Sequence, residues 1–189
     1  VIFGLFKVSD FKALKFIANI YIDIIRGTPL LVQVFIMYYG VGSMLRPYGF
    51  QWNMIGGAFS AGCVTLSLNA GAYMAEIIRG GIEAVDKGQM EASRSLGLSY
   101  AKSMRLVILP QAIRTMVPSI INQFIITLKD TSILSVIGFP ELTNMGKTIA
   151  GNTFKSLQTW AIVGIMYMIV IVALSKLAKR IERRIDRGR

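Results

Sequence analysis

The sequence contains no histidine and a single cysteine, Cys63, among 189 residues. Without histidine these residues offer no imidazole ligand, general base or proton relay. One cysteine excludes an internal disulfide and any site that needs several thiolates. Neither a Ser-His-Asp triad nor a Cys-His pair can be assembled from them. We therefore expect a non-enzymatic chain that holds no metal site.

Charge is scarce as well. Only 16% of the residues are charged and 53% are hydrophobic, whereas an average soluble domain is about 25% charged. The net charge of +11 would suit a nucleic-acid-binding protein, but the Lys and Arg residues gather between and after apolar runs. This distribution indicates a multi-pass membrane protein in contact with lipid, and it argues against nucleic acid as a partner.

Four apolar stretches approach the roughly 20 residues that a helix needs to cross a bilayer. We expect one transmembrane domain over 1–189, with spans at 28–45, 54–78, 103–128 and 156–178. Loops at 79–102 and 129–155 separate the last three spans. The third span contains Arg105, Arg114, Pro110 and Pro118, so we expect it to lie inside a bundle and to be kinked by its prolines.

The distribution of Lys and Arg predicts the topology. Residues 7–26, 79–114 and 176–189 together hold 17 of the 21 Lys and Arg residues. The positive-inside rule places these segments, and therefore the C-terminus, in the cytoplasm. The loop at 79–102 is then cytoplasmic, and the loop at 129–155 is external.

The cytoplasmic loop carries signals for two successive helices. Asp86 can cap the first, with Gln89 as its capping-box partner. Gly97 suits the left-handed position that ends a helix, and Ser99 can cap the next one. A short helix with both ends marked, between two spans, is typical of a segment that a cytoplasmic partner binds.

This loop resembles the EAA loop of bacterial ABC importer permeases, through Glu91-Ala92-Ser93, Gly97 and Val107-x-Leu109-Pro110. Ser93 stands where the family has its second alanine. Three further segments resemble permeases for polar amino acids: Arg26 to Gln33, Gly71 to Gly81 and Leu128 to Ser132. The resemblance covers nearly the whole chain from Lys7 onward. Family members have one more spanning helix before this point, so we expect a segment to precede the stub at residues 1–6.

The resemblance implies an all-α helical bundle of the type I ABC importer kind in the bacterial inner membrane. It also implies a subunit that moves polar amino acids by alternating access. The implied partners are a cytoplasmic ATPase dimer, a second copy or a sister permease, and an extracytoplasmic amino-acid-binding protein. The residues implied in coupling to the ATPase are Asp86, Glu91, Ala92, Arg94, Gly97, Leu109 and Pro110.

ATP and Mg²⁺ are expected on the partner ATPase and not on this chain. Gly146-Lys147-Thr148 mimics the end of a phosphate-binding loop, but Glu141 occupies the position of the required glycine. Polar groups near the middle of a span are costly without a purpose, so they are candidates for the substrate path. These candidates are Gln33, Tyr38, Thr65, Asn69, Tyr73, Glu76, Asn122, Gln123 and Asp130.

Two alternatives remain open for these residues. Interhelical hydrogen bonding explains many polar side chains in spans, and Glu76 can pair with Arg79 three residues on. For the whole chain, the alternative function is an ATP-independent, ion-coupled carrier or channel. Such a protein usually has acids or histidines deep in several spans, and here Glu76 and Asp130 are the nearest candidates.

Overall fold

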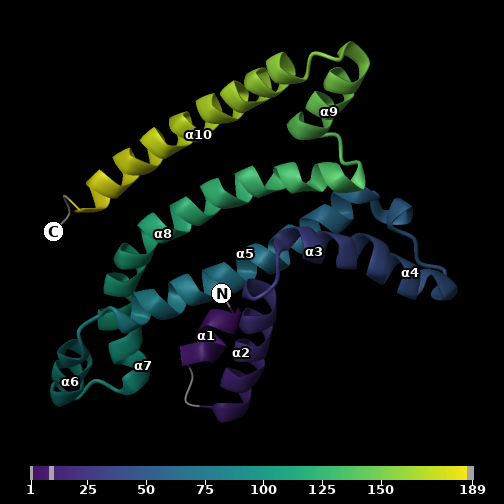
Figure 1. Cartoon of the computed structure of the whole chain (residues 1–189). Coiled ribbons are helices and arrows are strands. Elements are labelled where there is room, and N and C mark those ends of the chain that lie inside the picture. Colours follow the sequence, from purple (N-terminus) through teal and green to yellow (C-terminus); the bar gives the residue numbers. More distant parts are fainter. Residues whose placement is uncertain (1, 9–10, 187–189) are drawn as a thin grey trace. The chain divides into compact units, whose positions relative to one another are not determined.

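The computed structural model describes residues 2–8 and 11–186, and every regular element within those ranges is helical. Figure 1 shows three long helices, α5, α8 and α10, joined by shorter ones. This confirms the predicted all-α class. The α-helices are α1 (Ile2–Val8), α2 (Lys12–Arg26), α3 (Leu30–Phe35), α4 (Gly42–Leu45), α5 (Ala58–Glu83), α6 (Lys87–Ser95), α7 (Tyr100–Ser103), α8 (Leu109–Asp130), α9 (Leu142–Thr153) and α10 (Ser156–Asp186).

Tighter and wider helical turns join several of these helices. Three 3₁₀ segments occupy Arg46–Tyr48, Trp52–Ile55 and Thr131–Ile137. Two π-helical turns occupy Ile36–Val41 and Met104–Ile108. The second π turn joins α7 to α8 just before Pro110. In the expected third span, the irregular backbone therefore precedes Pro110, and α8 continues through Pro118.

By length and composition, three helical stretches of the described residues can cross a membrane: Ala58–Glu83, Tyr100–Ile137 and Ser156–Arg183. A fourth candidate exists if α2 and the helices that follow Pro29 are taken as one broken span. Helix α5 begins later than the expected residue 54 because Gly56 and Gly57 both have positive φ. It also continues past residue 78, where Arg79 pairs with acids on both sides of it along the helix.

The chain divides into two compact units. The first comprises Val1–Asp23, Gly71–Gln123 and Ala178–Arg189, and the second Ile24–Ala70 and Phe124–Leu177. In the second unit, Val34 of α3 packs with Leu134 and Ile137 of the 3₁₀ segment. A Cβ on Gly62 of α5 would lie 2.6 Å from Leu134 Cδ1, so glycine permits this close approach.

In the first unit, α1 packs on α5 through small residues. A Cβ on Gly4 would lie 3.1 Å from Ile78 Cβ and 3.2 Å from the backbone of Ala75. Phe3 stacks on Tyr21 of α2 with ring centroids 4.2 Å apart. Gly81 of α5 lies so close to Met116 of α8 that a Cβ would meet the methionine Cγ at 2.1 Å.

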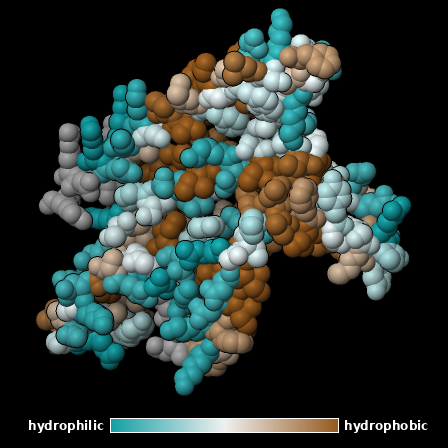
Figure 2. Space-filling model, in the orientation of Figure 1, coloured by the Kyte–Doolittle hydropathy of each residue, from teal (hydrophilic) through white to brown (hydrophobic). Residues whose placement is uncertain are grey.

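Many large apolar side chains are exposed, and brown patches lie among hydrophilic ones on the face drawn in Figure 2. On α10, Ile162, Ile165 and Ile169 are each more than half exposed. Soluble monomers rarely leave large contiguous apolar patches exposed. The surface therefore has the composition that a lipid environment favours.

Candidate functional site

Helix α6 in the loop between α5 and α7 is closed at both ends by its own sequence. Asp86 Oδ1 accepts a hydrogen bond from the Gly88 backbone N–H at 2.6 Å. At the other end Gly97 has φ +85°, and its N–H donates to Arg94 O at 2.9 Å. The Leu98 N–H donates to Ser93 O at 3.3 Å, which completes a Schellman motif. The predicted roles of Asp86 and Gly97 in ending this helix are confirmed.

Two of the expected capping contacts are absent from the described residues. Gln89 does not close a capping box; its Oε1 accepts from Gln111 Nε2 at 3.3 Å. Ser99 stands at the N-cap position of α7, but its side chain makes no capping bond there. The Ser99 carbonyl instead accepts from the Ser103 N–H at 2.9 Å, so the backbone alone begins this helix.

Helix α6 presents most of its surface outward. Glu91, Ala92 and Arg94 are exposed, while Ser93 is buried and donates to Met90 O at 2.9 Å. A hollow of about 500 Å³ lies between the end of α5, the start of α6 and the π turn, with Met90 and Met104 among its lining residues. The loop motif thus forms a helix that packs on the rest of its unit through one face and is otherwise exposed.

The π turn after α7 connects this loop to α8. The Leu109 N–H bonds to Met104 O, five residues back, which is a π-helical bond. Pro110 follows and has no N–H to donate, so it cannot continue the hydrogen-bond ladder. Among the described residues, the buried Ser103 Oγ at the start of this turn has no hydrogen-bond partner. Wide turns of this kind occur often at functional sites.

Gln33 and Asn69 form a buried amide network in the second unit. Asn69 Nδ2 donates to Gln33 Oε1 at 3.0 Å. Gln33 Nε2 lies 2.6 Å from Ile25 O, 3.0 Å from Thr28 O and 2.9 Å from Thr28 Oγ1. The network therefore joins α5 to the end of α2 and to the short non-helical connection between α2 and α3.

The other predicted path residues of the second unit do not join this network. Thr65 is buried, and its hydroxyl donates to Ala61 O in the preceding turn at 2.8 Å. Tyr38 is half-buried against the Val34, Leu134 and Ile137 cluster. Asp130 is half-buried at the end of α8.

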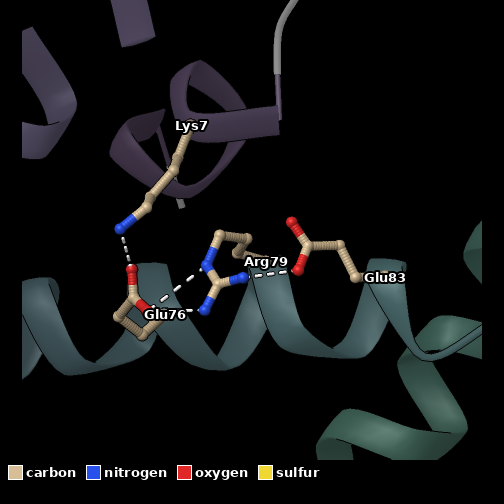
Figure 3. A network of polar contacts seen from close by, with 4 residues as sticks. All are labelled: Lys7, Glu76, Arg79 and Glu83. Atoms are coloured by element: carbon tan, nitrogen blue, oxygen red, sulfur yellow. Dashed lines mark hydrogen bonds and ion pairs between the residues drawn. The ribbon is translucent and has the colours of Figure 1, made fainter. Parts of the chain in front are cut away.

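Glu76 lies at the centre of an ion-pair network in the first unit. Its carboxylate pairs with Lys7 of α1 and with Arg79 Nη2, which lies 2.9 Å from Oε2. Arg79 also pairs with Glu83 one turn further on (Figure 3). The Arg79 partner follows from helical spacing, whereas Lys7 is 69 residues away in sequence and has no local signal.

The remaining path candidates of the first unit differ in exposure. Tyr73 of α5 and Asn122 of α8 are exposed, and Gln123 is buried. Sequence reasoning missed a polar cluster in the second unit around Glu141. Its carboxylate caps α9 by accepting from the Thr143 and Asn144 N–H groups at 2.8 and 2.6 Å, and it accepts from Tyr167 Oη at 2.9 Å.

These features define a multi-pass membrane protein with an exposed helix between two of its candidate spans. The chain belongs to the family of binding-protein-dependent transport system inner membrane components, whose model matches residues 1–187. The glutamine transport system permease protein GlnP of Escherichia coli is 43% identical over 168 residues, which cover 89% of this chain and 74% of that protein. The arginine transport system permease protein ArtQ of Bacillus subtilis is 37% identical over 185 residues, 98% of this chain and 81% of ArtQ.

Solved structures agree with this assignment. An amino acid ABC transporter crystallised with histidines superposes with a TM-score of 0.87 at 44% identity, covering 96% of this chain and 81% of that chain. The inward-facing MetNI methionine ABC transporter superposes with a TM-score of 0.75 at 18% identity, which shows the shared fold. The predicted family and importer fold are confirmed, and they favour a permease over an ion-coupled carrier.

Proposed function

We propose that this chain is the membrane-spanning subunit of an ATP-driven importer for polar amino acids. The relatives named above are described as permeases or transporters for glutamine, arginine and other amino acids. The observation that carries the proposal is the exposed, capped helix α6 inside the family's loop motif. It supplies a rigid surface by which a separate ATPase can drive the spans.

The proposed coupling runs from α6 to α8. Because both ends of α6 are closed, the helix moves as a rigid body when the ATPase dimer closes. The π turn at Met104–Ile108 and Leu109-Pro110 connect it to α8. A wide turn followed by proline has fewer ladder bonds to break than a regular helix, so this joint changes its geometry at a lower energetic cost.

The proposed assembly pairs this chain with a second copy or a sister permease, because a few spans enclose little space. An extracytoplasmic binding protein delivers the amino acid, and a cytoplasmic ATPase dimer holds ATP and Mg²⁺. The loop with α6 and the C-terminus both lie in the cytoplasm under the positive-inside rule.

We assign the polar path candidates two different roles. Asn69 donates to Gln33, and Gln33 donates to backbone oxygens and to the Thr28 hydroxyl, so we assign both residues to stabilising the second unit. Glu76 orders α1 against α5 through Lys7. In the first unit, the exposed side chains of Tyr73 and Asn122 are the residues we propose for contact with the substrate.

The experiment is co-purification of this chain with its ATPase, comparing the native sequence with Glu91→Lys. Glu91 is exposed on α6, so its charge reversal should weaken ATPase binding without unfolding the chain. The matched control is Asp23→Lys, a charge reversal at another exposed position on α2, which should leave binding intact. Equal binding by both variants would contradict the docking role. Amino-acid uptake by the native chain in vesicles without any ATPase would favour the carrier instead.

A further inference from the structure

The C-terminal part of α10 carries four exposed cations on one face. Lys176, Lys179, Arg180 and Arg183 are all exposed and follow the spacing i, i+3, i+4 and i+7. At 100° per residue these four positions fall within a sector of about 100°, along about 10 Å of one unbroken helix. We call them the basic stripe. Hydrophilic residues gather over this part of α10 in Figure 2.

The side of α10 opposite the basic stripe is buried at Ala178. Ala178, which points to the opposite side of the helix, is only 7% exposed. The four stripe residues are exposed, and so is Leu177 beside them, at 53%. Among the described residues, no salt bridge joins a stripe cation to an acid.

The same face of α10 is apolar before it becomes basic. Ile162, Ile165, Ile169 and Val172 are exposed, and helical geometry places them in the sector that the stripe continues. An exposed apolar face on a candidate span is the surface that contacts lipid tails. The change from apolar to basic between Val172 and Lys176 therefore marks where hydrocarbon meets headgroups.

We propose that the basic stripe binds the headgroups of anionic phospholipids. Four cations in two turns, directly after a lipid-facing apolar face, match the negative charge and the depth of a phosphate layer. The attachment would hold the end of α10 at the membrane surface. The stripe uses residues outside the coupling loop, so the inference is argued without the transported substrate or the coupling role of α6.

The test measures which lipids lie beside the stripe in the full chain. Cys63→Ala removes the single cysteine, and Leu177→Cys places a fluorescent label next to the stripe. The chain is reconstituted in phosphatidylcholine vesicles that contain a spin-labelled quencher lipid, either phosphatidylglycerol or phosphatidylcholine. We expect the anionic quencher to bind about five-fold better at low salt, with the preference falling at high salt.

Replacing all four stripe cations with glutamine should bring the preference close to one. Two matched controls should keep it: a variant with each Lys and Arg exchanged for the other, and Lys12→Gln with Lys15→Gln on α2. Equal quenching by both lipids in the native chain, or an unchanged preference in the glutamine variant, would overturn the proposal. Loss of the preference on adding inorganic phosphate at constant ionic strength, or exclusion of both lipids once the ATPase binds, would also overturn it.

Discussion

Helices α6 and α9 are two short helices between candidate spans, and both are capped at their two ends, by different residues. Each begins after an acidic N-cap, Asp86 or Glu141. Each ends at a residue with left-handed backbone, Gly97 at φ +85° or Phe154 at φ +58°. Both are therefore closed helices joined to the rest of the chain by short connections.

The two helices differ in how they are held. The cap of α9 also accepts from Tyr167 of α10, and a Cβ on Gly146 would lie 2.9 Å from Val163 Cγ2. Lys147 of α9 donates to Ser135 Oγ at 3.0 Å. Side chains thus tie α9 into its own unit, whereas α6 leaves Glu91 and Arg94 exposed. The comparison indicates that closed ends make a helix rigid, and that exposed polar residues then make it available to a partner.

The largest expected effect is at the cap of α9. Glu141→Ala removes two capping bonds and the bond from the Tyr167 hydroxyl, which then has only Thr143 Oγ1, 3.3 Å away, as a partner. We expect it to lower the free energy of unfolding by about 2–3 kcal/mol. Thermal unfolding in detergent measures the loss, and Tyr167→Phe is the control, with a cost of about 1 kcal/mol. An unchanged melting temperature for Glu141→Ala would show that α9 is not held by this cluster.

Gly97→Val should cause the second-largest loss of stability and the largest loss of function among these variants. A β-branched residue at φ +85° costs about 1–2 kcal/mol, because its Cβ meets the following carbonyl. Nothing lies within 4 Å of a Cβ at this position, so the effect is on the backbone alone. We expect substrate-stimulated ATPase activity of the complex to fall while the chain stays inserted. Gly151→Val, in α9 with equally open space, is the control that should retain stimulation.

Asp86→Ala should cost about 1 kcal/mol, less than Glu141→Ala, because it removes one capping bond and no tertiary contact. Hydrogen exchange of the first turn of α6 measures the local loss. Asp86→Ser retains an acceptor and should restore most of the protection. If Asp86→Ala destabilises the whole chain as strongly as Glu141→Ala does, the contrast between the two helices is wrong.

The smallest effect has the opposite sign. Phe154 is 91% exposed and has a backbone conformation that glycine adopts freely. We expect Phe154→Gly to stabilise the chain by up to about 1 kcal/mol, since relief of the left-handed strain exceeds the entropy cost of glycine. A small rise in melting temperature relative to Phe154→Ala measures it. A fall would mean that the exposed ring is held by a partner.

Local features were predictable from the sequence because their causes lie within a few residues. Asp86 and Gly97 mark the ends of α6 through bonds to residues no more than five positions away. The predicted capping contacts of the Gln89 and Ser99 side chains are not formed, and for Gln89 the reason is a partner outside the helix. Gln89 instead bonds to Gln111, which is 22 residues away, and this tertiary partner competes with the local one.

Long-range partners determine which contacts the polar residues make. Gln33 and Asn69 were predicted as path candidates from their polarity alone, but a bond across 36 positions joins them. The Glu141 cluster went unnoticed because glutamate is not among the favoured N-cap residues and Tyr167 is distant in sequence. Packing likewise decides that Ser103 is buried and that Gly97 is exposed.

The sequence by itself determined that this protein is all-α, crosses a membrane and carries a closed helix in the family's loop motif. Apolar run length, the distribution of Lys and Arg, and capping residues are enough for those conclusions, because each acts over one turn or along one span. Only the tertiary structure decided that Lys7 pairs with Glu76, that Gln33 bonds to Asn69 and that α9 is tied to α10. Those contacts need elements far apart in the chain to pack together, and no local pattern of residues encodes which ones will meet.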